Sequence, residues 1–140
     1  RMQIKGKCEA LLAVSPNRIT LNELTAQSII INGRSCYAHG QVNVSHILFQ
    51  HLKSEEQATV IETNRKQNRL KEDDDVSPFR GKFKVTEGSR LEIIELQLED
   101  SDLIVCQNAA LKFHVRGTLH LPRAELYIYP MGKITSKGEL

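Results

Sequence analysis

The chain has 140 residues, of which 40% are hydrophobic and 26% charged, and its 19 basic and 17 acidic residues give a net charge of +2. A chain of this length can bury on the order of 68% of its unfolded surface, which predicts a single domain over residues 1–140. No apolar run approaches the ~18 residues of a membrane span. The small net charge is also unlike the electrostatic footprint of a nucleic-acid-binding protein. We therefore expect neither a membrane nor nucleic acid as a direct partner.

The N-terminal half has the pattern of short β-strands. The β-branched run Gln27–Ile31 ends at Asn32-Gly33, a pair typical of tight hairpins because both residues accept a positive φ. We therefore predict that Gln27–Ile31 pairs antiparallel with Ser35–Ala38. The first residues are basic and are broken by Gly6, unlike a secretory leader, and we expect the C-terminal part of a longer protein. Whether the first forty residues lie inside the main β fold or wrap outside it stays open.

Residues 64–78 break the composition of the chain. This stretch is basic in its first half and acidic in its second, and it has almost no large apolar side chains. The acidic run Glu72–Asp75 lacks the Gly and the terminal Glu of a calcium-binding loop. We predict a flexible, solvated charged loop, with docking to a charged partner as the alternative.

The stretch Arg90–Leu98 predicts a long strand with apolar residues on both faces. Under strict alternation, Leu91 and Ile93 face one side, and Ile94, Leu96 and Leu98 face the other. A strand that is apolar on both sides is typical of a central strand or of an oligomer interface.

The stretch Ala110–Pro130 predicts three further strands. Gly117 provides a tight turn after the first, and Pro122 must stand at a strand end because it cannot donate a ladder hydrogen bond. The last strand, Tyr127–Tyr129, has apolar or amphipathic groups on both sides. About ten to twelve short strands separated by turns favour a β-sandwich or jelly roll.

Catalytic and metal-binding signatures are missing from the sequence. There is no nucleophile elbow, no phosphate-binding Gly-rich loop and no H-x-H or H-E-x-x-H unit among the five histidines His39, His46, His51, His114 and His120. The cysteines Cys8, Cys36 and Cys106 are widely spaced and form no C-x-x-C pair, so we expect reduced core residues in an intracellular protein. We predict no enzyme activity, no metal and no cofactor.

Three features stand out in the second half of the chain: Phe83-Lys-Val85 with Gly88, the strand Leu91–Leu96, and Leu121-Pro-Arg-Ala-Glu-Leu-Tyr-Ile128. Together they resemble the C-terminal cupin domain of the centromere protein C family, including the cupin of the chromosome alignment defect protein, a centromeric histone assembly factor. Ala124 and Glu125 replace the Gly and Asn that are usual in that corner. Metal-dependent cupins carry His-x-His after Gly, whereas here Gly33 is followed by His39 and then Gln41.

The resemblance implies an all-β, cupin-like jelly roll (a double-stranded β-helix) that has lost its metal. It also implies a nuclear location at the centromere and kinetochore. The protein would be a homodimer that docks a second centromeric cupin of the centromere protein C type. We expect a dimer or partner interface formed by Leu91, Ile93, Ile94, Leu96, Leu98, Tyr127, Ile128 and Tyr129. One alternative is a metal- or small-molecule-binding cupin that uses His39, His114 and His120, and another is a structural or viral β-sandwich in a larger oligomer.

Overall fold

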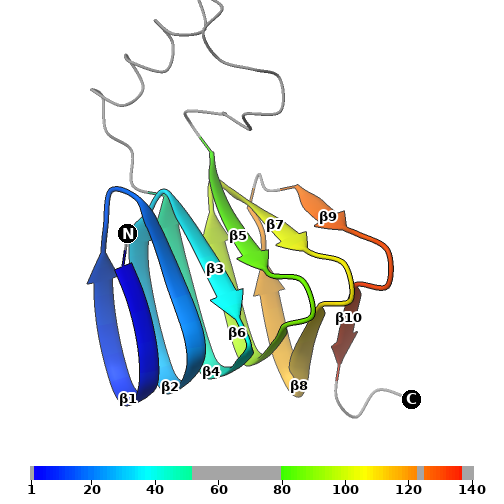
Figure 1. Ribbon diagram of the computed structural model, residues 1–140, viewed down its shortest axis with the longest axis horizontal. Coiled ribbons are helices and arrows are strands. Elements are labelled where there is room, and N and C mark those ends of the chain that lie inside the picture. Colours follow the sequence, from blue (N-terminus) through cyan, green and yellow to red (C-terminus); the bar gives the residue numbers. More distant parts are fainter. Residues whose placement is uncertain (1, 52–79, 123–124, 137–140) are drawn as a thin grey trace, which may run out of the picture.

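The computed structural model describes residues 2–51, 80–122 and 125–136, and within these ranges it contains ten β-strands and no helix (Figure 1). The strands in chain order are β1 (Met2–Val14), β2 (Arg18–Gly33), β3 (Ser35–His39), β4 (Gln41–His51), β5 (Gly81–Val85), β6 (Arg90–Glu99), β7 (Ser101–Val105), β8 (Ala110–His120), β9 (Leu126–Ile128) and β10 (Lys133–Ser136). No helix long and apolar enough to cross a membrane occurs in these ranges. The predicted charged loop at 64–78 lies outside the described residues.

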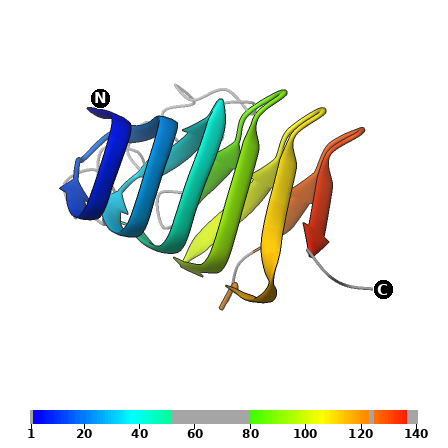
Figure 2. The same cartoon turned by 90° about the horizontal axis from the view of Figure 1, so that it is seen from below.

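The strands form a parallel β-solenoid of about five turns. Every strand ladder between them is parallel, with the order β10-β8-β6-β4-β2-β3-β5-β7-β9 and β1 added beside β2. Successive coils stack in a row, so the two termini lie at opposite ends of the stack (Figures 1 and 2). The prediction of a cupin-like jelly roll is therefore wrong, because a jelly roll is built from antiparallel strands.

Each coil has three faces, which we number in chain order. Face 1 consists of the short strands β3, β5, β7 and β9 with residues 18–22 of β2. The rest of β2 (residues 24–33) and the long strands β4, β6 and β8 then continue as face 2 in their first part and face 3 in their second part. A pair of adjacent residues that both point away from the core, such as Ser45 and His46 in β4, separates the two halves.

The core is a set of columns in which equivalent apolar residues of successive coils stack on one another. One column on face 1 runs through Ile19, Cys36, Phe83 and Leu103, all fully buried. Columns of this kind bury apolar side chains without any helix or second sheet to cover them, because the coil closes on itself. The hydrophobic effect therefore favours the stack of coils as a whole rather than any one strand pair.

The predicted hairpin at Asn32-Gly33 is also wrong. β2 and β3 are parallel, with Arg18 level with Ser35, whereas Gln27–Ile31 runs beside β4, with Ile29 level with Ile47. Asn32 and Gly33 end face 3 of one coil, and the chain begins face 1 of the next. A Cβ on Gly33 would lie 3.2 Å from Ile19 Cδ1 and 3.3 Å from the Ser15 carbonyl oxygen, so close packing favours glycine at this position.

Candidate interaction surfaces

The C-terminal end of the solenoid leaves two core columns open. Leu103 lies level with Leu126, and Val105 with Ile128, so these two β9 residues continue the inward columns of face 1. Leu103 and Val105 are fully buried, whereas Leu126 and Ile128 are 45% and 50% exposed. Among the described residues, no further coil packs on β9. The last members of the core columns therefore face solvent.

Other apolar side chains surround this open end. Tyr127, Tyr129 and Met131 are also exposed, and Met131 is the most exposed of the group at 68%. Terminal coils of repeat proteins usually present a polar cap, because an apolar end invites association. We call the five residues Leu126, Tyr127, Ile128, Tyr129 and Met131 the end patch.

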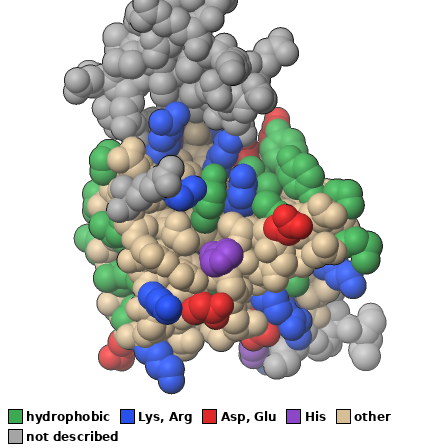
Figure 3. All heavy atoms as spheres, in the orientation of Figure 1, with side chains coloured by type: hydrophobic (Ala, Val, Ile, Leu, Met, Phe, Trp, Pro, Cys, Tyr) green, Lys and Arg blue, Asp and Glu red, His purple; other side chains and the backbone are tan. Residues whose placement is uncertain are grey.

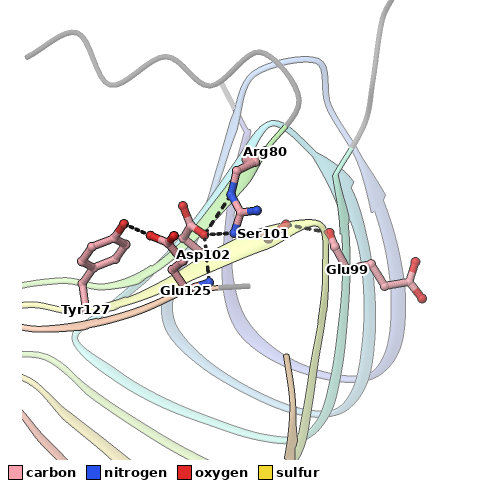
Figure 4. Close-up of polar contacts among 6 residues, drawn as sticks. All are labelled: Arg80, Glu99, Ser101, Asp102, Glu125 and Tyr127. Atoms are coloured by element: carbon pink, nitrogen blue, oxygen red, sulfur yellow. Dashed lines mark hydrogen bonds and ion pairs between the residues drawn. The ribbon is translucent and has the colours of Figure 1, made fainter. Parts of the chain in front are cut away.

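A polar cluster ties β9 to the preceding coil (Figure 4). The Arg80 guanidinium donates from Nε to Asp102 Oδ1 at 3.1 Å and contacts the same oxygen through its terminal nitrogen. The backbone N–H of Glu125 donates to the same oxygen at 3.1 Å, and the Tyr127 hydroxyl donates to Glu125 Oε2. The hydrogen bond to Asp102 raises the pKa of Arg80, and the bond to Glu125 raises the pKa of Tyr127. These contacts fix β9 against the preceding coil and so orient the end patch.

A groove of about 490 Å³ crosses several coils on the outside of face 2. Apolar residues such as Ile94 and Phe113 line it together with charged and neutral polar ones, among them Lys7, Thr25, Asn43, Glu92, Lys112 and His114. Near one end, a bulge projects from β8, because Phe113 lies level with Ile93 and Thr118 with Glu95. Gly117 closes this bulge, since a Cβ there would lie 2.7 Å from the Ile94 carbonyl oxygen. The groove can offer hydrogen bonds. Its thiol, Cys8 on β1, and its imidazole, His114 on β8, are separated by the three strands β2, β4 and β6.

The histidines of the alternative hypothesis come from separate parts of the coil. His39 ends face 1, where its Nδ1 lies 2.9 Å from Thr86 Oγ1, and His114 lies in the β8 bulge beside the groove. His120 is exposed at the end of β8, on face 3. In the described part of the chain, no three His, Cys, Asp or Glu side chains lie close enough to hold a metal ion.

The predicted interface residues fall into three sets. Leu91, Ile93, Leu96 and Leu98 are core residues with at most 3% exposure, so they are not available to a partner on the surface. Ile94 is half-buried at the bend of β6 and lines the groove. The remaining residues, Tyr127, Ile128 and Tyr129, lie together in the end patch.

Sequence reasoning missed Leu126 and Met131 in the end patch. Leu126 lies level with Leu103 of the preceding coil, and this alignment would have identified it. The alignment becomes visible only once the coil repeat is known. That repeat is irregular: it takes 17 residues from Arg18 to Ser35, 20 from Gly81 to Ser101 and 23 from Leu103 to Leu126. A comparison of the chain with family models, curated proteins and solved structures finds no match.

Proposed function

We propose that this chain is a non-enzymatic assembly module that dimerises by packing the end patches of two copies against each other. The observation that carries the proposal is the exposure of Leu126 and Ile128, the last members of two core columns. Burial of the exposed half of each side chain contributes about 1 kcal/mol. Tyr127 and Tyr129 add amphipathic area of the kind that is enriched in interfaces.

A second copy suits this surface because a two-fold axis places the same patch on both sides. Such an isologous contact is self-complementary and closes at two subunits. The free edge of β9 adds main-chain donors and acceptors, which a strand of another copy can pair. The expectation of a centromeric partner and a nuclear location came from the cupin resemblance. The parallel solenoid gives it no support, so the proposal names only a second copy.

Light scattering after gel filtration tests the proposal at micromolar concentration. Wild-type protein should have the mass of a dimer, and Ile128→Asp should have the mass of a monomer, because the carboxylate would be buried without a partner. Val115→Asp is the matched control: Val115 is 52% exposed, close to the 50% of Ile128, but lies in the β8 bulge away from the end patch. It should remain a dimer.

Two results would contradict the proposal. One is a monomeric wild-type protein, and the other is equal dissociation by Ile128→Asp and Val115→Asp with both variants folded by circular dichroism. A mass that keeps rising with concentration indicates a head-to-tail polymer, in which the end patch contacts β1 of the next copy, and rejects the closed dimer.

A further inference from the structure

Two basic side chains lie over one aromatic ring on face 1, and two more lie near them. Tyr37 on β3 lies between β2 and β5, and both neighbours carry a cation over its ring. The guanidinium carbon of Arg18 is 4.8 Å from the ring centroid, and Nζ of Lys84 is 5.0 Å from it. Arg34 and Lys82 complete what we call the basic cluster, which consists of Arg18, Arg34, Lys82 and Lys84.

The cations of the basic cluster repel one another. Desolvation is the main cause that lowers the pKa of Lys82, and the charges of Lys84 and Arg34 lower it further. Asp102 acts in the opposite direction, but its carboxylate also binds Arg80. Arg18, Arg34 and Lys84 add three further cations to this part of the face, so basic side chains are concentrated there. Figure 3 shows several Lys and Arg side chains close to one another in the upper half of the face.

We propose that the basic cluster binds the surface of a membrane that contains anionic lipids. A cluster of basic residues at an anionic leaflet gains about a fivefold factor in binding for each Lys or Arg near the surface. Tyr37 suits the same place, because its ring is apolar and its hydroxyl polar. The net charge of the whole chain, +2, gives no sign of this cluster. The cluster forms because the coil repeat brings basic residues from different parts of the sequence to one face.

The shape of face 1 favours a lipid surface over nucleic acid. Its strands β2, β3 and β5 form a parallel sheet, and readout of a DNA groove requires a helix or a two-stranded ribbon that enters the groove. Single-stranded nucleic acid requires aromatic rings on which bases stack. Here the Tyr37 ring is already in contact with Arg18 and Lys84. Binding to an extended anionic surface requires neither an element that enters a groove nor an aromatic ring that is free to stack.

The test is co-sedimentation with vesicles at low ionic strength. Phosphatidylcholine vesicles that contain phosphatidylserine should bind the wild-type chain, and phosphatidylcholine vesicles alone should not. The double variant Arg18→Gln/Lys84→Gln should bind roughly thirtyfold more weakly, since two basic residues are lost. Lys112→Gln/Lys133→Gln is the matched control: it removes the same charge from face 2, on β8 and β10, and should keep most of the binding.

The outcomes separate this proposal from general charge effects and from dimerisation. Failure of the wild-type chain to bind the anionic vesicles would overturn it, as would equal losses in the two double variants. Tighter binding to a single-stranded oligonucleotide, measured by fluorescence anisotropy and lost in the Arg18/Lys84 variant, would reassign the cluster to nucleic acid. Ile128→Asp should bind vesicles through the unchanged cluster even as a monomer, so failure of the dimer leaves this test intact.

Discussion

Removal of residues 52–80 should leave the solenoid intact, because this segment is inserted between two consecutive positions of a coil. Before it, His51 lies level with Gly33, and after it, Lys82 lies level with Ser35. Gly81 therefore stands level with Arg34, the residue that directly follows Gly33. The next coil agrees, because Gly81 lies level with Ser101. The two ends are also adjacent in space: a Cβ on Gly81 would lie 3.2 Å from the Cβ of His51.

The variant joins residue 51 directly to Gly81 and replaces His51 with Gly. Glycine is chosen because Asp100, at the same corner of the next coil, has a φ of 50°. For a flexible chain of about 30 residues, closure between fixed ends costs about 3 kcal/mol of chain entropy, and the deletion would recover this cost. Loss of Arg80 removes a partly exposed ion pair with Asp102 and costs up to about 1 kcal/mol. The deletion should therefore raise the free energy of unfolding by about 2 kcal/mol.

Urea denaturation followed by circular dichroism measures this difference. The parent chain and the deletion variant should both unfold cooperatively, and the variant should have the higher midpoint. A control that deletes the same segment but inserts a short Gly-Ser linker should fall between them. A variant that is unfolded, or less stable than the parent, would show that the coils on either side do not stack in the register described here.

Two more predictions concern the core. Phe49 and Phe83 lie on opposite sides of the insertion with ring centroids 6.2 Å apart and an interplanar angle of 81°. Phe83→Ala should therefore cost about 3–5 kcal/mol in urea denaturation and Phe83→Leu clearly less; a loss under about 1 kcal/mol for the alanine variant would contradict this packing. Burial raises the pKa of the Cys36 thiol, so the folded state keeps its proton while the unfolded chain ionises above about pH 8.5. Stability should thus fall as the pH rises above that value, and Cys36→Ala should reduce this slope; a slope equal to that of the parent chain would refute the prediction.

The strand Arg90–Leu98 shows which part of the fold could be predicted. Its extent was correct to within a residue, since β6 is Arg90–Glu99, and its apolar residues do mark the core. The error was in the alternation. Ile94 and Glu95 both point away from the core where the strand bends, so Leu91 and Ile93 on one side of the bend and the later leucines on the other all face inward. Strict period-two alternation holds only for a straight strand. When it is applied across such a bend, it wrongly assigns the residues after the bend to the opposite face.

Strand direction could not be predicted from local patterns. Asn32-Gly33 satisfies the rule for a tight hairpin, but here the partner of each strand is a whole coil away, so the local rule selects the wrong neighbour. A regular repeat would have revealed the solenoid. The unequal coils and the insertion of residues 52–80 conceal it. Tyr127, Ile128 and Tyr129 stand out in the sequence because apolar or amphipathic groups fall on both sides of that strand, whereas the basic cluster becomes visible only from the coil register.

The stacking of coils in chain order has a consequence for synthesis. Apart from the two coils on either side of the insertion, each coil packs on the coil synthesised just before it. The coils therefore leave the ribosome in the order in which they stack. A growing chain therefore presents at every moment a newest coil with an open edge, which the next coil covers. Among the described residues, the end patch is the last such edge. Folding that proceeds from the first coil would form this patch only after the coils on which it rests have been made.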